Sequence, residues 1–349
     1  MANDTLIKKI KISAIIQETE HAKTFVFECL NGWKPLYKPG QFITLIFYTM
    51  TGEKRRSYSI SSTPSLNGEL RITVKKVDNG EFSRYMLSHL MVGDVLSTSG
   101  ISGLFILPES ISLTNHFCFI AAGSGIVPCF SLIKTILATT SNEVTLIYSN
   151  KNKEETIFYE ALQTLLEKHA TRFKTRFLFS DNNDLYNKRL SKWLLEQLLQ
   201  EYLGRNIENA LFYLSGPHDY MQTVEITLRI QVPKEKIIKE NFSSFPRLIL
   251  PEPPDKNSHH VKIHLNEKVH TIRVQYPKSI LAAAKEQNIE LPYSCEAGRC
   301  SSCVATCTKG KVWMAYNEVL VEKEIEKGRI LVCQSFPIDG DAEIVYDIN

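Results

Sequence analysis

The sequence predicts a multidomain fold in which an antiparallel β-barrel is followed by a doubly wound parallel α/β sheet and a smaller α+β domain. Short alternating or β-branched runs fill residues 10–107, as in small antiparallel barrels. From residue 116, buried strands alternate with amphipathic helices, which is typical of a parallel sheet covered on both faces. A proline-rich stretch at 246–257 then precedes a segment with clustered cysteines.

Length and composition exclude several classes of protein. The chain has 349 residues, which is too long for a single hydrophobic core. Its composition, with 43% hydrophobic and 23% charged residues, is ordinary for globular domains. The formal net charge is +3, and no basic tract suggests a nucleic-acid partner. No apolar run approaches the roughly 20 residues of a membrane helix, and the N-terminus lacks an apolar signal core. We therefore expect a cytoplasmic protein without a membrane span.

The barrel is expected over residues 1–110. Its strands are predicted at 12–17, 23–29, 41–48, 70–77 and 94–100, where runs of β-forming residues are separated by Gly, Pro and Asn. One helix interrupts them, because Phe82, Tyr85, Met86 and Leu90 recur at helical spacing.

The parallel sheet is expected over residues 111–244. Its strands are predicted at 117–123, 144–150, 171–180 and 209–217, and its helices at 130–140, 154–169 and 189–203. A linker is predicted at 245–258. The last domain, 259–349, should contain a hairpin (261–265 and 270–276), a helix (279–289) and strands at 330–334 and 342–347.

Four cysteines predict an iron–sulfur site. Cys295, Cys300 and Cys303 have the spacing C-x4-C-x2-C, and Cys333 follows later. This is the plant-type arrangement for a [2Fe–2S] cluster, which needs four thiolates. Structural zinc is the alternative, because zinc also accepts four cysteines, although its sites favour two paired knuckles. We interpret Cys307 as structural.

The cysteine segment also resembles a known family. LPYSCEAGRCSSCVATCTKGKVWM, followed by ILVCQ, is similar to the plant-type [2Fe–2S] ferredoxins across 259–349. The resemblance implies a β-grasp domain in which Cys295, Cys300, Cys303 and Cys333 hold the cluster.

A second group of residues indicates a flavin site. Arg56, Tyr58 and Ser59 lie on one extended segment and could meet a pyrophosphate, a ring face and a ring-edge acceptor, although an ordinary edge strand would also contain such residues. With its neighbours, the segment resembles the FAD-binding barrel of the ferredoxin–NADP reductase superfamily. The resemblance implies a catalytic position for Ser59 beside the reactive ring nitrogen. It also implies FAD binding by Arg56, Tyr58, Ser59, Lys75, Gly80, Ser83 and the later Phe242.

A glycine-rich turn indicates the nucleotide site. Gly123, Gly125 and Pro128 form G-x-G-x-x-P after a buried strand, where backbone amides can approach a dinucleotide phosphate. The pattern resembles the nicotinamide site of the same superfamily, whose second half would be Ser215, Gly216 and Pro217. Most members have cysteine where this chain has Ser215, and we expect hydride transfer to survive with the hydroxyl. Several candidates for a 2′-phosphate slightly favour NADPH over NADH: Ser149, Asn150, Lys151, Lys153, Lys188 and Arg189.

Together the resemblances imply an oxidoreductase with FAD, a [2Fe–2S] cluster and NAD(P)H. A hydride would pass from NAD(P)H to FAD, and single electrons would pass to the cluster and on to a partner protein such as an oxygenase, hydroxylase or desaturase. The domain order resembles the reductases of phthalate dioxygenase, phenylacetyl-CoA epoxidase and hybrid-cluster protein systems. Two alternatives stay open: direct flavin reduction of a small acceptor, and an electron-transfer subunit or redox sensor within a fixed complex.

Overall fold

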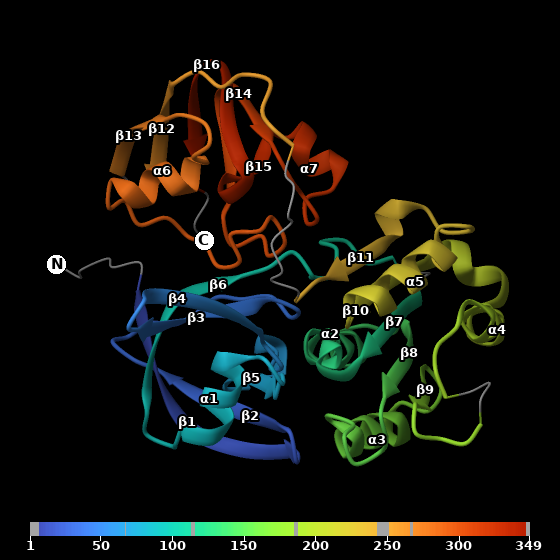
Figure 1. The fold of residues 1–349 in the computed structure, drawn as a ribbon. Coiled ribbons are helices and arrows are strands. Elements are labelled where there is room, and N and C mark those ends of the chain that lie inside the picture. Colours follow the sequence, from blue (N-terminus) through green and yellow to red (C-terminus); the bar gives the residue numbers. More distant parts are fainter. Residues whose placement is uncertain are drawn as a thin grey trace. The chain divides into compact units, whose positions relative to one another are not determined.

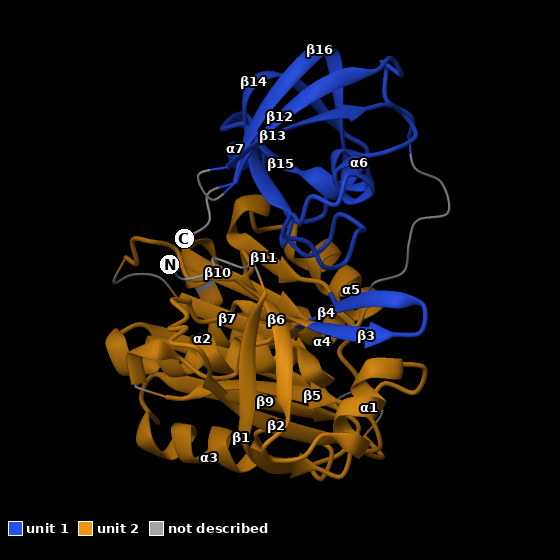
Figure 2. Cartoon of the chain, turned by 90° about the vertical axis from the view of Figure 1, so that its left-hand side faces the viewer, with its two compact units in different colours: residues 1–6, 46–57, 242–349 blue, residues 7–45, 58–241 orange. Residues whose placement is uncertain are grey.

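The structure is a computed structural model that describes residues 7–66, 68–112, 116–184, 188–242, 251–265 and 268–346. Two compact units make up the chain (Figure 2). One comprises residues 7–45 and 58–241, and the other includes residues 46–57 and the C-terminal part from residue 242. Residues 245–250 of the predicted linker lie outside the described residues.

The N-terminal sheet has six strands in the order β4-β3-β6-β1-β2-β5 (Figure 1). Strand β1 pairs antiparallel with β2 and β6, and β2 pairs antiparallel with β5. The alternation of apolar residues buries one face, with Ile10, Ile12 and Phe25 fully inaccessible. The elements are β1 (Lys8–Thr19), β2 (Ala22–Cys29), β3 (Phe42–Thr49), β4 (Gly52–Ser59), β5 (Leu70–Lys75), α1 (Glu81–His89) and β6 (Val95–Ser102).

The second sheet has five parallel strands in the order β11-β10-β7-β8-β9, which confirms the predicted doubly wound arrangement. One hydrophobic cluster packs α2 and α3 on one face, and a second cluster packs α4 and α5 on the other. The elements are β7 (His116–Ala122), α2 (Ile126–Thr139), β8 (Glu143–Asn150), α3 (Tyr159–Lys168), β9 (Phe173–Phe179), α4 (Lys192–Tyr202), β10 (Ala210–Ser215), α5 (His218–Leu228) and β11 (Ile237–Glu240).

The helix predicted at 154–169 is shorter than expected, because α3 begins only at Tyr159. Phe158, just before it, adopts φ = 62°. This left-handed conformation turns the ring of Phe158 onto that of Phe130, with centroids 4.2 Å apart. Core packing therefore outweighs the helical pattern of residues 154–158.

The C-terminal sheet has the order β13-β12-β16-β14-β15. The residues predicted as a strand at 330–334 divide into β15 and a 3₁₀ turn (Val332–Gln334), so Cys333 lies on the turn. Strand β14 was not predicted. The elements are β12 (His259–Leu265), β13 (Lys268–Val274), α6 (Ile280–Glu286), β14 (Val304–Met314), α7 (Glu322–Glu326), β15 (Arg329–Leu331) and β16 (Ser335–Val345). Within the described ranges, none of the helices combines the length and apolar character needed to cross a membrane.

Candidate nucleotide, flavin and cluster sites

The carboxyl ends of β7, β10 and β11 bring the predicted nucleotide residues together. The parallel register aligns Ala121 with Ser215, and Ser215 with Glu240. Ser215 and Glu240 are the last residues of β10 and β11, and Ala121 is the last but one of β7. Ligands of open α/β sheets bind at this edge, so the register alone places Ser215 and Glu240 at the expected site.

The glycine turn contacts the segment that begins at Ser215. Gly123–Gly125 forms a 3₁₀ turn before α2. A Cβ atom on Gly125 would lie 2.0 Å from the carbonyl oxygen of Ser215, so glycine is required at this position. The Tyr148 hydroxyl donates to the carbonyl oxygen of Gly123 at 3.0 Å and holds the turn from the next strand. The two predicted halves of the nicotinamide site are therefore adjacent.

Ser215 is buried, and its hydroxyl has no hydrogen-bond partner among the described residues. Beside it, a Cβ atom on Gly216 would lie 3.1 Å from the Cβ of Ala122. Pro217 precedes the first turn of α5, and Pro128 is buried at the start of α2. A buried hydroxyl without a partner is costly, and at the carboxyl edge of a parallel sheet it fits a ligand that would bond to it.

Ser59 reaches the same edge of the sheet. Its Oγ donates to Oε2 of Glu240 at 3.1 Å. Burial raises the pKa of the Glu240 carboxyl to about 8, although the Ser59 bond acts in the opposite direction. Glu240, Asn241 and Phe242 have the E-x-F pattern that resembles the closing segment of the family, which turns back toward the flavin, and Phe242 is 44% exposed. The structure adds the hydrogen bond between Ser59 and Glu240, which the pattern does not contain.

The other residues predicted to bind FAD differ from Ser59 and from one another in exposure and in hydrogen-bond partners. Arg56 is exposed and donates to the carbonyl oxygen of Arg55 at 2.7 Å, and Tyr58 is half-buried. Ser83 Oγ accepts from the amide of Val77 and donates to the carbonyl oxygen of Gly80, both at 3.2 Å. The Ser83 hydroxyl therefore closes the turn before α1.

Lys75 lies at the glycine turn. Its Nζ is 3.8 Å from the position that a Cβ of Gly123 would take. It also pairs with Glu155 at 3.9 Å, which in turn pairs with Lys151 at 3.3 Å. The resemblance assigns Lys75 to FAD, whereas its ammonium group lies beside the nucleotide turn.

Some of the residues predicted to bind a 2′-phosphate already contact other side chains of the protein. The hydroxyls of Ser149 and Tyr220 bond to each other at 3.1 Å. Lys153 pairs with Glu160 at 3.9 Å, and its ammonium group lies 4.6 Å from the centre of the Tyr159 ring.

The four predicted cluster ligands form two pairs. The amide of Cys295 donates to Cys300 Sγ at 3.4 Å, and the amide of Ala297 donates to Cys295 Sγ at 3.3 Å. Hydrogen bonds from Cys300 and from backbone amides lower the pKa of Cys295 to about 6. In the second pair, hydrogen bonding to Cys333 and burial raise the pKa of Cys303. Two thiol pairs fit a cluster with two irons, each of which needs two thiolates.

The loop between these cysteines needs unusual backbone angles. Glu296, Gly298 and Ser301 adopt φ values of 54°, 71° and 55°. A Cβ on Gly298 would lie 2.9 Å from the carbonyl oxygen of Tyr316, so both the angle and the space favour glycine. The glycine therefore lets the backbone bend between the cysteines.

Comparison with protein families identifies all three parts. Residues 9–106 match the oxidoreductase FAD-binding domain, residues 119–225 the oxidoreductase NAD-binding domain, and residues 263–337 the 2Fe-2S iron-sulfur cluster binding domain. The chain is a flavin and iron–sulfur reductase. It joins an FAD barrel, an NAD sheet and a C-terminal ferredoxin domain, as predicted, and the third match favours the cluster over zinc.

Relatives of this reductase match it over nearly the full length of both chains. The ferredoxin reductase component of 3-ketosteroid-9-alpha-monooxygenase from Mycobacterium tuberculosis is 29% identical over 98% of this chain and 96% of its own. One of the subunits of 1,2-phenylacetyl-CoA epoxidase from Escherichia coli is also 29% identical, over 98% of both chains.

Solved structures show the same fold. Phthalate dioxygenase reductase has a TM-score of 0.60 at 21% identity, over 97% of this chain and 98% of its own. An intact type IV self-sufficient cytochrome P450 monooxygenase has a TM-score of 0.73 at 19% identity and covers 97% of this chain, which spans only 41% of that longer one.

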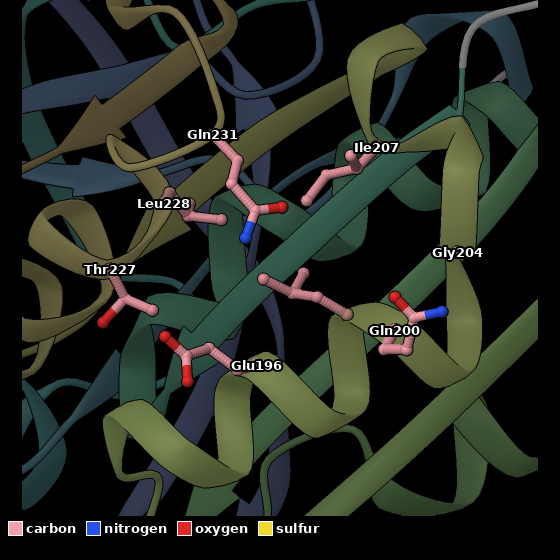
Figure 3. Close-up of a pocket in the computed structure, with 8 residues that line it drawn as sticks. Glu196, Gln200, Gly204, Ile207, Thr227, Leu228 and Gln231 are labelled. Carbon is pink, nitrogen blue, oxygen red and sulfur yellow. The ribbon is translucent and has the colours of Figure 1, made fainter.

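The reductase also has a small pocket away from these sites. Figure 3 shows it, ≈ 50 Å³ in volume, with lining residues that include Gln200, Ile207 and Leu228. Ile207 precedes β10, so the pocket lies toward the amino end of that strand, whereas Ser215 ends it. Sites for small organic ligands occupy roughly 300–1,000 Å³, so this pocket is too small for a nucleotide.

Proposed function

We propose that the reductase takes electrons from NAD(P)H and delivers them singly to a separate protein, which is an oxygenase or a related hydroxylase or desaturase. The observation that carries this proposal is the meeting of Gly125, Ser215, Glu240 and Ser59 at one sheet edge, on a chain that also carries two thiol pairs. The names of the relatives support the oxygenase, because both are components of oxygenase or epoxidase systems.

The chain supplies binding and orientation for the nucleotide. The turn at Gly123 and Gly125, with Pro128 behind it, would hold the pyrophosphate against backbone amides. Ser215, Gly216 and Pro217 would bound the nicotinamide. The closeness of Gly125 to Ser215 means that one dinucleotide could touch both segments.

Arg56, Tyr58 and Ser59 would bind FAD, with Gly80 and Ser83 at its pyrophosphate and Phe242 near its ring. When bound, FAD supplies the conversion between a two-electron hydride donor and a one-electron cluster. The chain keeps a proton beside this site, because burial raises the pKa of Glu240 to about 8. At neutral pH, that carboxyl is therefore mostly neutral and accepts the Ser59 hydrogen bond without an ionic charge.

Cys295, Cys300, Cys303 and Cys333 would hold the [2Fe–2S] cluster. We assign the FAD domain to residues 1–110, the NAD(P) domain to 111–244, the linker to 245–258 and the ferredoxin domain to 259–349. We propose a cytoplasmic location, because reduced, clustered cysteines suit a reducing compartment. We also propose a slight preference for NADPH, on the lysines after β8.

The test is an anaerobic titration of the purified reductase with NADPH and, separately, NADH, followed by visible absorbance and low-temperature EPR. We expect the flavin and cluster absorbance bands to bleach and a one-electron EPR signal of the cluster to appear. The amount of each nucleotide that is needed for this reduction ranks NADPH against NADH. Cys300→Ser should lose the cluster signal and retain flavin bleaching. Cys307→Ser is the matched control and should retain both.

Two outcomes would redirect the proposal. A flavin that bleaches while the cluster stays oxidised, together with unchanged turnover of a small acceptor in Cys300→Ser, would indicate a direct flavin reductase. Stable co-purification with a catalytic subunit would indicate an electron-transfer subunit of a fixed complex.

A further inference from the structure

Tyr346, the residue after β16, carries a buried hydroxyl that the proposed function does not explain. The residue is 7% exposed, and its hydroxyl has no hydrogen-bond partner among the described residues. Its backbone is fixed, because the Tyr346 amide donates to the carbonyl oxygen of His264 at 3.0 Å. Buried hydroxyls nearly always have a partner, so this one indicates a group other than those that the described residues supply.

Strand register sets the direction of the Tyr346 side chain. In the antiparallel β14–β16 ladder, Thr306 is opposite Val345, and the next step places Ala305 across from Tyr346. Directly opposite residues share a face of the sheet, and so do residues two apart on one strand. Tyr346 therefore lies on the same face as Ala305, which comes two residues after Cys303. Cys303 immediately precedes β14 and, like Ala305, is 2% exposed. An aromatic side chain can reach neighbours about 7–8 Å away.

Cys333 is also buried, on the turn whose backbone contacts Cys303. Leu331 is opposite Val304 in the β14–β15 ladder, and the amide of Val332 donates to the carbonyl oxygen of Cys303 at 3.2 Å. Cys303 and Cys333 are 2% and 7% exposed. Burial raises the pKa of Tyr346, and the Cys303 and Cys333 thiols raise it further.

We propose that the Tyr346 hydroxyl donates a hydrogen bond to sulfur on the Cys303–Cys333 side of the cluster and raises the cluster's reduction potential. The inference rests on the proposed cluster and adds a residue that tunes it. A reduced cluster carries one more negative charge than an oxidised one, so a fixed O–H donor stabilises the reduced form more. Hydrogen bonds to sulfur and burial are the protein's main means of setting such potentials.

The experiment is an EPR-monitored redox titration of full-length, cluster-loaded reductase as wild type and as Tyr346→Phe. The variant keeps the ring and removes only the donor. At a fixed potential, its ratio of reduced to oxidised cluster should fall about three- to tenfold, which is a midpoint lower by about 30–60 mV. Tyr276→Phe is the matched control, because that hydroxyl bonds to the exposed Glu252 at 3.3 Å, and its midpoint should not move.

An unchanged midpoint in Tyr346→Phe, with an intact cluster spectrum, would overturn the inference. If the phenylalanine variant fails to hold the cluster, 3-fluorotyrosine at position 346 provides the second test. Its hydroxyl is a stronger donor, so the midpoint should rise, and a midpoint equal to wild type would equally overturn the inference. Absence of any [2Fe–2S] signal from wild type would instead refute the proposed cluster, which keeps the two failures distinguishable.

Discussion

Ser59 and Glu240, 181 positions apart in the chain, meet in a hydrogen bond of 3.1 Å. Ser59 ends β4 and Glu240 ends β11, so the bond links the end of a barrel strand to the edge of the parallel sheet. Ser215 is the register neighbour of Glu240. The serine predicted at the flavin and the serine predicted at the nicotinamide therefore share one glutamate as a neighbour.

The first prediction concerns the proton on Glu240. Its pKa is about 8 in the folded protein, against an ordinary value of 4.5. Between these values the unfolded chain has lost the proton that the folded protein keeps, so stability falls as the pH rises from about 4.5 to about 8. Glu240→Gln removes this dependence. The gain in unfolding free energy of the variant over wild type should grow with pH, by at most about 1.4 kcal/mol per unit, and level off above pH 8.

Urea unfolding at pH 5, 6, 7, 8 and 9 measures this difference. Glu167→Gln is the control, because this carboxylate is exposed on α3, and its difference from wild type should stay flat. A difference for Glu240→Gln that is also flat with pH would show that the carboxyl is already ionised in the folded protein.

Local patterns made the fold and the cluster site predictable from the sequence. Cys295, Cys300 and Cys303 lie within one loop, so their spacing alone indicated the cluster. The G-x-G-x-x-P turn is likewise a contiguous segment. Continuous apolar runs such as residues 117–122 of β7 distinguished the parallel sheet from the alternating barrel.

Contacts between distant segments could not be predicted in this way. The E-x-F pattern marks Glu240 in the sequence, but only register and burial bring its carboxyl group to Ser59. Tyr346 looks like any tyrosine at the end of a strand until the β14–β16 register brings it opposite Ala305, two residues after Cys303. The predicted start of α3 was wrong because the packing of Phe158 on Phe130 depends on tertiary structure, which the helical periodicity of the segment does not contain.

A second prediction concerns the closest backbone approach in the nucleotide site. Gly125→Ala would place a methyl group 2.0 Å from the Ser215 carbonyl oxygen, so the turn and the Ser215 segment must separate. We expect loss of NAD(P)H binding by at least tenfold and destabilisation by about 1–3 kcal/mol. Gly68→Ala is the control, since its nearest contact would be 3.8 Å. Isothermal titration with NADP⁺ and NAD⁺ checks the binding, and wild-type affinity in Gly125→Ala would contradict the prediction.

A third prediction decides which cofactor Lys75 serves. Its ammonium group lies beside the Gly123 turn and pairs with Glu155, so Lys75→Met should raise the KM for NAD(P)H about tenfold and leave the FAD content of the purified protein unchanged. The expected size is that of one charge-assisted hydrogen bond, roughly 1.5–3 kcal/mol. Lys76→Met, the exposed neighbour, is the control. Loss of FAD from Lys75→Met at an unchanged KM for NAD(P)H would indicate that Lys75 binds FAD, as the family resemblance implies.

The last prediction concerns the buried hydroxyl of Ser215, at the position where the family resemblance implies a thiol in most members. Ser215 Oγ is buried without a partner among the described residues, and an unsatisfied buried hydroxyl costs about 1–3 kcal/mol. Ser215→Ala should therefore stabilise the nucleotide-free protein by about 1 kcal/mol. If the hydroxyl bonds to the bound nucleotide, the same variant should bind NAD(P)H more weakly.

Ser215→Cys should keep hydride transfer, because the thiol packs in the same space and tolerates burial. Unfolding without nucleotide, together with stopped-flow flavin reduction, measures both effects. A loss of stability in Ser215→Ala would mean that the hydroxyl already has a partner in the folded protein.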